Sequence, residues 1–126
     1  MQQRPIKFRA WDTDKKVMNP YVTIIEGMVL LTPAKPENQI VMEFTGLLDK
    51  NGNEIYEGDI VRYEFTDTVE VGVVGWNAER ARWGFTSSDG VNYGISQQDI
   101  VKRAEFIGNI HENPDLIESG AITPKK

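Results

Sequence analysis

Residues Glu43 to Val61, EFTGLLDKNGNEIYEGDIV, carry the turn chemistry that decides the fold of this chain. Asn51-Gly52 is a pair that tight β-hairpins favour, because both residue types tolerate a positive φ. Gly58-Asp59 predicts a second turn, directly before Ile60-Val61 opens an alternating run. The stretch therefore predicts the end of one strand, a hairpin, and the start of a further strand. It contains no catalytic motif.

Short alternating runs of apolar and polar residues extend outward from this segment in both directions. Val61, Tyr63 and Phe65 alternate with polar residues, which is typical of a half-buried strand. Further strands are expected at 6–12, 17–18, 21–31 (two short strands or one bulged strand), 40–44, 69–76, 83–86, 91–95 and 105–110. Many short strands with turn signals between them indicate a sandwich or a small barrel.

Little helix is expected. Residues 96–99 could form one capped turn, and Asn113-Pro114 resembles a helix start, which predicts a short helix over 114–119. Asn19-Pro20 is expected to interrupt the strand that starts at Val17, and 32–38 is expected to be a loop. No composition shift divides the chain, so a single domain over 1–126 is expected, with its core at about 6–117 and a frayed tail at 121–126.

The composition excludes several kinds of site. There is no cysteine, hence no disulfide or thiolate zinc site, and His111 is the only histidine. We therefore expect no metal and no other cofactor. No run of apolar residues is long enough to span a membrane, and Met1 to Pro5 does not begin a signal peptide.

The formal net charge of the chain is −5, with 19 acidic and 14 basic residues. Non-specific nucleic-acid binding depends on lysine and arginine neutralising phosphates, so this balance argues against it for the chain as a whole. A local basic patch stays compatible with the sequence.

Three acidic or polar groups bear a superficial resemblance to reactive or metal-binding sites. Asp49, Asn51 and Asn53 match the first ligand positions of a calcium loop, but Glu54 stands where a glycine is required and Ile60 where the final glutamate is required. A hairpin turn is the preferred interpretation.

The carboxylates of Glu54, Glu57 and Asp59 are close together in sequence and are candidates for acid–base chemistry or magnesium binding. We prefer a solvated acidic turn. His111-Glu112 is a candidate catalytic pair, but no nucleophile accompanies it, and we prefer a surface or capping histidine.

The most suggestive candidate binding site is the hairpin WNAERARW, in which Trp76 and Trp83 bracket a tip that carries Arg80 and Arg82. Arginine and aromatic residues together favour protein hot spots, stacked bases or nucleic-acid backbones. The alternative is that both tryptophans belong to the core and the arginines keep the loop soluble. For a functional site we favour a protein partner over nucleic acid because of the net charge.

A second basic-aromatic cluster stands near the N-terminus, where Arg4, Lys7 and Arg9 accompany Trp11. The preferred interpretation is the solvent face of a first strand, with Phe8 and Ala10 on the opposite face.

Several of these segments together resemble the YopX-like proteins of bacteriophages and prophages. The resembling segments are Lys7–Asp12, Phe44–Leu47, Asp49–Gly52, Ile55–Val61, Gly72–Trp76, Gly84-Phe85 and Ile107–Pro114. They cover the chain from about Lys7 to Ile117, and residues 21–39 contain none of them.

The resemblance implies a small phage or prophage protein, cytoplasmic in its bacterial host, without an established activity or a catalytic set. It also implies a mainly β fold with an SH3-type barrel at its centre. Together with the strands and the helix expected above, this predicts a small SH3-type barrel core with extra N-terminal strands and a short C-terminal helix. We therefore expect a non-enzymatic module that binds a host or phage protein, and that forms a homo-oligomer through its edge strands.

Three alternatives stay open at this point. A nucleic-acid-binding module requires Lys7, Arg9, Arg80 and Arg82 on one face. An enzyme that uses Glu54, Glu57, Asp59 or His111 requires that these groups converge in a pocket and have shifted pKa values. A decoy of a host nucleic-acid-binding protein requires a contiguous acidic face.

Overall fold

The computed structural model describes residues 6–25, 28–30, 38–87, 90–95 and 102–118. The backbone of these residues forms two antiparallel sheets, which confirms the prediction of a mainly β fold. The chain divides into two compact units, Met1–Phe44 and Thr45–Lys126, called here the N-terminal and C-terminal units. The expectation of a single domain stays a prediction.

The N-terminal unit is built on three strands and the first part of a fourth: β1 (Phe8–Asp12), β2 (Val17–Ile25), β3 (Met28–Leu30) and β4 (Gln39–Leu48). Strands β2 and β3 pair with each other, so segment 21–31 forms two strands rather than one bulged strand. The first sheet has the order β3-β2-β1-β4-β5, in which β5 is Glu54–Tyr56.

Strand β2 runs through Asn19-Pro20, so the predicted interruption at this pair is wrong. The register between β1 and β2 shifts from Phe8↔Val22 to Ala10↔Asn19, which places a bulge next to Pro20. A bulge leaves one residue out of the hydrogen-bond ladder, and a proline that has no N–H to donate is tolerated there.

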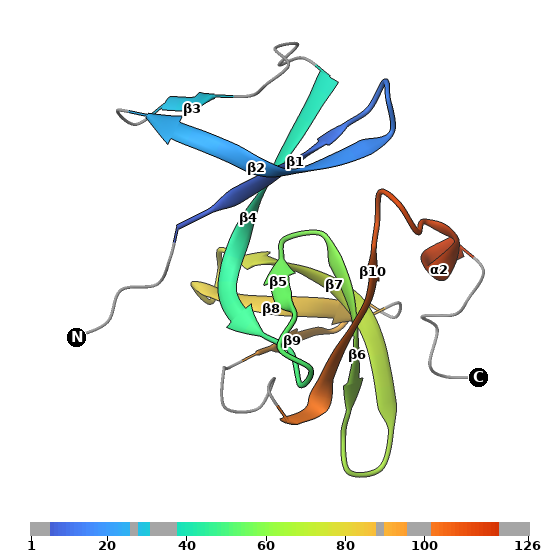
Figure 1. Cartoon of the computed structure of the whole chain (residues 1–126). Helices are drawn as coiled ribbons and strands as arrows, with labels where there is room; N and C mark the ends of the chain where they lie inside the picture. The colour runs from blue at the N-terminus through green and yellow to red at the C-terminus, as the bar shows by residue number, and fades with distance from the viewer. Residues whose placement is uncertain (1–5, 26–27, 31–37, 88–89, 96–101, 119–126) are drawn as a thin grey trace. The chain divides into compact units, whose positions relative to one another are not determined.

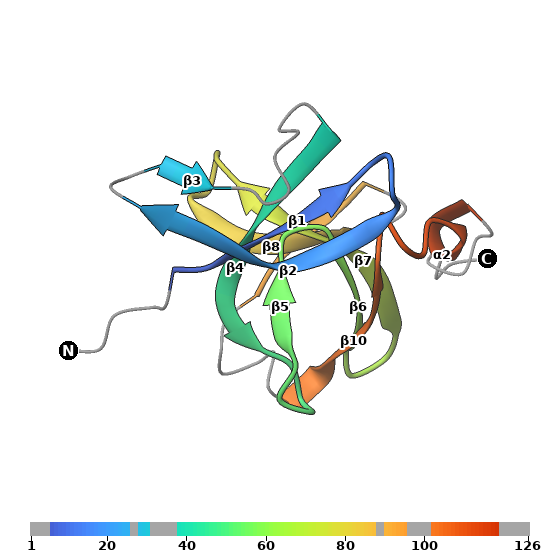
Figure 2. The ribbon, with the colours of Figure 1, turned by 45° about the horizontal axis from the view of Figure 1, so that its top comes forward.

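The C-terminal unit contains the rest of β4 and the strands β5 (Glu54–Tyr56), β6 (Asp59–Glu64), β7 (Val69–Asn77), β8 (Arg82–Ser87), β9 (Asn92–Gly94) and β10 (Ala104–Asn109). Its main sheet has the order β10-β6-β7-β8-β9 and curves into a half-barrel (Figure 1). Figure 2 shows β10 along β6, as their register requires. A single turn of helix, α2 (Asp115–Glu118), follows β10.

Glycine at position 46 turns β4 within the strand, because its φ of 87° is open to glycine at little cost. Thr45 fixes the same bend with its side chain: its hydroxyl donates to the carbonyl of Ile55 at 2.7 Å and accepts the N–H of Leu47 at 3.1 Å. The bend thereby connects β4 to β5.

The hairpin predicted at Asn51-Gly52 is present, but its geometry differs from the prediction. Among the described residues, Gly52 has a positive φ of 85° and Asn51 does not. The N–H of Gly52 donates to the carbonyl of Asp49 at 3.0 Å, and the N–H of Asp49 donates to the carbonyl of Asn53 at 2.9 Å. This longer loop needs one left-handed residue instead of two.

Apolar side chains on the two faces of the half-barrel form two clusters. The inner cluster is centred on Val61, Tyr63, Val74 and Phe85, and its rings stack, with Tyr63 and Phe85 centroids 5.3 Å apart. The alternation predicted for residues 61–65 accounts for Val61 and Tyr63 in this core. The outer cluster consists of buried Ile60 and Val71 with half-buried Val73, Ile107, Ile110 and Leu116.

The preferred interpretation of the first strand is wrong for two residues. Arg9 is 8% exposed and Trp11 is 6% exposed, so this side of β1 is not a solvent face. The guanidinium Nη2 of Arg9 lies 3.7 Å from the sulfur of Met42 on β4. Lys7 is half-buried, with its ammonium 4.9 Å from the centre of the Phe44 ring.

Several predictions concern residues outside the described ranges. They are Arg4, most of the loop at 32–38, the capped turn at 96–99 and the tail at 121–126.

Candidate functional site

Trp76 and Trp83 face each other across the β7–β8 hairpin. They are register partners, and their rings meet edge to face, with centroids 5.3 Å apart and planes at 76°. Trp83 is half-buried and packs against the inner core cluster. Trp76 keeps 52% of its surface exposed. One tryptophan is therefore anchored in the core, and it supports another that is presented to solvent.

The tip of this hairpin is held in a strained turn. The N–H of Arg80 donates to Oδ1 of Asn77 at 3.2 Å, and Ala81 has a φ of 51°. A left-handed conformation costs a residue with a Cβ about 1–2 kcal/mol. The side chain of Arg80 is exposed at this tip.

Arg82 lies on the other face of the sheet from the tryptophans. It neighbours Trp83 on β8, and successive side chains of a strand point to opposite faces. A Cβ on Gly94 would stand 2.6 Å from Arg82 Cζ, so the guanidinium lies against the bare backbone of β9. The four predicted residues thus occupy three places: a tryptophan pair, the tip, and the outer face.

Side chains on this outer face are linked in a chain that crosses three strands. Asn77 Nδ2 donates to Asn92 Oδ1 at 2.9 Å, and Asn92 Nδ2 donates to Thr86 Oγ1 at 3.0 Å. The first bond spans from β7 to β9 over Gly84, where a Cβ would lie 3.0 Å from Asn92 Oδ1. Glycine at this position leaves room for the bond.

The loop that resembles a calcium site is organised around its own carboxylate. Asp49 is 2% exposed and accepts four hydrogen bonds: from Asn51 N at 2.9 Å, Asn53 N at 2.8 Å, Asn53 Nδ2 at 3.1 Å and Phe106 N at 2.8 Å. The Asp49 side chain therefore links the β4–β5 loop to β10, as a hairpin element.

The charge on Asp49 is stabilised in spite of its burial. Burial alone would raise the pKa of this carboxyl group, but hydrogen bonds from Phe106 and Asn53, with that from Asn51, outweigh it and lower the pKa below 3.8. Asp49 is therefore ionised at neutral pH.

The turn at 57–59 is not the solvated acidic turn that the sequence suggests. Asp59 is fully buried, and its Oδ2 accepts the N–H of Tyr56 at 2.7 Å. Glu54 is exposed and Glu57 half-buried. In the part of the chain that the structure describes, no three acidic or histidine side chains are grouped closely enough to hold a metal ion.

The segment around His111 is a closed turn. Oδ1 of Asn109 accepts the backbone N–H groups of His111 at 2.9 Å and Glu112 at 2.8 Å. Nδ2 of Asn109 donates to the Glu112 carboxylate at 2.9 Å. The carboxylate next to His111 is thus used to close the turn, in agreement with a capping function for this segment.

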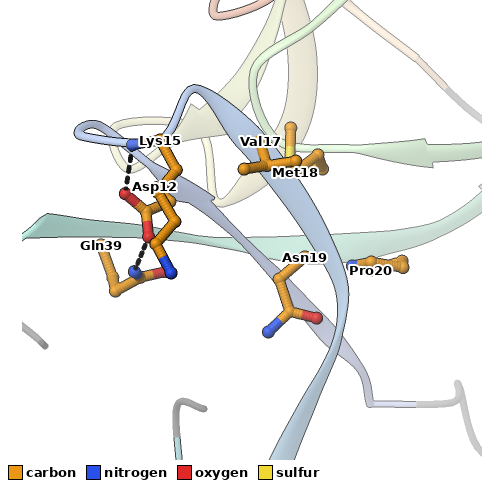
Figure 3. A pocket seen from close by; sticks show the side chains of 7 residues that line it. All are labelled: Asp12, Lys15, Val17, Met18, Asn19, Pro20 and Gln39. Carbon is orange, nitrogen blue, oxygen red and sulfur yellow. Dashed lines mark hydrogen bonds between the residues drawn. The ribbon is translucent and has the colours of Figure 1, made fainter. Parts of the chain in front are cut away.

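The N-terminal unit contains a cavity of about 310 Å³ that the sequence did not predict. Its lining comes from β1, β2, β4 and the β1–β2 turn: Asp12, Lys15, Val17, Met18, Asn19, Pro20 and Gln39. Figure 3 shows Asp12, Lys15 and Gln39 together at one end, and Asn19 and Pro20 further along. A cavity assembled from three strands leaves no local signal in sequence.

The carboxylate of Asp12, at one end of this cavity, accepts hydrogen bonds that hold the β1–β2 turn. Oδ1 of Asp12 accepts the N–H groups of Asp14 and Lys15, both at 2.9 Å, and Oδ2 accepts Gln39 Nε2 at 3.0 Å. The hydrogen bond from Lys15 is the main cause that lowers the pKa of Asp12 below 3.8. The Asp12 carboxylate therefore holds the turn and Gln39, and the other charged group in the lining is Lys15.

Comparison with known proteins assigns this chain to a family. The family profile described as "YopX protein" matches residues 7–118. The chain belongs to the YopX family. The resemblance inferred from the segments between Lys7 and Ile117 is thereby confirmed.

Two solved structures place this YopX-family chain among related folds. Protein EF1440 from Enterococcus faecalis is 28% identical, with a TM-score of 0.67 over 91% of this chain and 99% of that one. Protein yopX from Bacillus subtilis is 18% identical, with a TM-score of 0.58 over 90% of this chain and 98% of that one. No curated protein matches the sequence. Among the described residues, no helix has the length and apolarity needed to cross a membrane.

Proposed function

We propose that this YopX-family protein is a non-enzymatic module that binds another protein through the Trp76–Trp83 pair. The observation that supports this most directly is the 52% exposure of Trp76 next to a tryptophan anchored in the core. Tryptophan is enriched among the few interface residues that provide most of the binding energy.

The supporting ring makes Trp76 suited to this function. Edge-to-face contact with Trp83 at 5.3 Å restricts the exposed ring before a partner arrives. Since ordering a side chain is one of the costs of association, a pre-ordered ring binds with a smaller loss of entropy. The strained turn at Ala81 leaves Arg80 exposed at the tip of the same hairpin.

A protein partner is favoured over nucleic acid by the distribution of charge. The net charge is −5, and Arg9, one of the four cations that a phosphate-binding face would need, is 8% exposed. Arg82 and the tryptophans are on opposite faces of β8. The decoy alternative needs a contiguous acidic face, and Asp49 and Asp59 are buried rather than part of a surface.

An enzymatic function has less support than binding. The carboxylates of Asp49, Asp59 and Glu112 accept hydrogen bonds within their own loops and turns, where they stabilise the fold. Of the carboxylates that an enzyme would need to bring together, Glu54 is exposed and Asp59 is fully buried.

The proposal includes the SH3-type core, the C-terminal helix, the phage origin and the self-association that we expect from the sequence. The curved sheet of the C-terminal unit supports an SH3-type core, and α2 supports a short C-terminal helix. Family membership supports an origin in a phage or prophage and action in the bacterial cytoplasm. Self-association through an edge strand such as β9 is a further form of the same binding function.

The test is affinity capture from nuclease-treated bacterial lysate with three proteins: wild type, Trp76→Ala and Ile6→Ala. Ile6 is 66% exposed, so its replacement controls for the loss of a surface apolar side chain. We expect a protein that wild type and Ile6→Ala capture and Trp76→Ala does not. Equal capture by all three, or recovery only without nuclease, would refute the proposal. Analytical ultracentrifugation of the same proteins tests self-association.

A further inference from the structure

The β4–β5 loop contains an asparagine whose surroundings favour a spontaneous reaction of its side chain with the backbone. Asn51-Gly52 is the only Asn-Gly pair in the sequence. Both residues are exposed, and the Asn51 side chain forms no hydrogen bond with the described residues. Glycine has no side chain to shield its backbone nitrogen, and a Cβ at Gly52 would meet no atom within 4 Å. The N–H of Gly52 donates to the carbonyl of Asp49 at 3.0 Å, so this hydrogen bond has to open before the nitrogen attacks.

We propose that Asn51 is a site of spontaneous deamidation, and that the reaction loosens the half-barrel. The backbone nitrogen of Gly52 bonds to the side-chain Cγ of Asn51. The Cγ–N bond of the amide breaks, and ammonia leaves with the proton that Gly52 loses. The result is a five-membered succinimide, and no oxidation or reduction takes place.

Water then opens the ring at one of its two carbonyl carbons. Attack at Cγ gives aspartate at position 51. Attack at the backbone carbonyl carbon gives isoaspartate, in which Gly52 is joined through the side chain and the main chain gains one methylene. The overall reaction consumes one water and releases one ammonia.

The consequence for the fold follows from the position of Asn51. Its own N–H donates to Oδ1 of Asp49 at 2.9 Å, and Oδ2 of Asp49 accepts the N–H of Phe106 on β10. A second carboxylate at position 51 places like charge beside an ionised and buried group. An extra methylene also displaces the N–H donors of the loop, so the connection to β10 weakens.

The neighbouring Asn53 provides an internal control. It stands in the same loop, but its side-chain amide donates to Oδ2 of Asp49 at 3.1 Å, and Glu54 follows it. The fixed amide and the side chain of Glu54 both hinder ring closure. Faster deamidation at Asn51 than at Asn53 would therefore result from the local structure around Asn51, and not from deamidation of asparagines in general.

The experiment ages the folded full chain at mildly alkaline pH and 37 °C, beside an Asn51→Gln variant, with digestion at low pH to avoid artificial deamidation. Mass spectrometry of the peptide that follows Lys50 separates positions 51 and 53 by their fragment ions. Hydrogen exchange at Phe106 and the urea midpoint are measured on aged and fresh protein.

We expect conversion at Asn51 well above that at Asn53, ammonia release in equal amount, and both aspartate and isoaspartate. The aged wild type should show faster exchange at Phe106 and a lower urea midpoint, and aged Asn51→Gln should show neither. Equal conversion at the two asparagines would overturn the proposal. So would conversion at Asn51 that leaves the Phe106 exchange and the midpoint unchanged.

Discussion

Replacement of Asp49 by alanine tests whether one buried carboxylate joins the β4–β5 loop to β10. Asp49 accepts four hydrogen bonds and is 2% exposed. A hydrogen bond to a charged group contributes about 1.5–3 kcal/mol to stability, and such values are not additive. The donors of the exposed loop can turn to water, whereas the N–H of Phe106 is half-buried on its strand.

We therefore expect Asp49→Ala to lower the free energy of unfolding by about 3–5 kcal/mol, which is more than one hydrogen bond to a charged group contributes and less than four such bonds would give if they were additive. A domain of ordinary stability has about 5–15 kcal/mol in total, so the loss is a large fraction. With a urea m value of about 2 kcal/mol per molar, the midpoint should fall by about 1.5–2.5 M.

The assay is urea unfolding followed by tryptophan fluorescence and circular dichroism. Asp67→Ala serves as the matched control, since Asp67 is an exposed aspartate in the β6–β7 turn. We expect the control to stay within about 0.5 kcal/mol of wild type. A loss of less than about 1 kcal/mol in Asp49→Ala would refute the reasoning, because it would show that the four bonds contribute no more than an ordinary surface contact.

The same carboxylate gives stability a defined pH dependence. The pKa of Asp49 is lowered in the folded state, so the folded protein takes up this proton less readily than the unfolded chain. The stabilisation is therefore fully present above the unfolded value of 3.8 and is lost as the pH falls through the lower folded pKa. The difference in unfolding free energy between wild type and Asp49→Asn should shrink across this window. A constant difference down to acid pH would contradict the assignment.

Two further substitutions test backbone geometry by the same urea assay. Ala81→Gly should stabilise the protein by about 0.5–1 kcal/mol, because it removes a left-handed cost of about 1–2 kcal/mol at φ 51° and adds a smaller entropy cost in the unfolded chain. A destabilised Ala81→Gly would show that the turn is not strained. Gly84→Ala should destabilise by about 1–3 kcal/mol, because the new Cβ would stand 2.6 Å from the carbonyl oxygen of Tyr93. An unchanged midpoint would refute the close approach of β8 to β9.

The strand pattern was predictable because alternation is a local property. Val61 and Tyr63 face the inner core as the sequence indicated, and the turns at 49–53 and 57–58 occur where glycine and asparagine predicted them. The left-handed residue at 52 without one at 51 was not predictable, because loop length depends on how β4 and β5 are paired.

Burial of charged groups escaped prediction for a different reason. Asp59 was expected to be solvated because carboxylates are seldom buried, yet its Oδ2 accepts the N–H of Tyr56. Asp49 was assigned to a hairpin turn, and its burial was not predicted. The donor to Asp49 from Phe106 is far away in sequence. Such long-range partners follow from how strands distant in sequence are arranged and not from local residue type.

The candidate site was predicted in part. The sequence pointed to the Trp76–Trp83 hairpin, and the structure brings these two rings together at 5.3 Å. The sequence did not indicate which tryptophan is anchored and which is exposed, because both lie in similar alternating runs of apolar and polar residues. Arg82 is directed to the other face by the register, in which it pairs with Asn77.

Binding of a protein partner through Trp76 is tested most directly by the affinity of a purified captured partner for wild type and for Trp76→Ala. A hot-spot residue contributes at least about 2 kcal/mol, which corresponds to about a thirtyfold change in Kd. We predict that Trp76→Ala binds at least that much more weakly, while Ile6→Ala binds like wild type. Equal affinities for wild type and Trp76→Ala would contradict the account and place the binding surface elsewhere on the molecule.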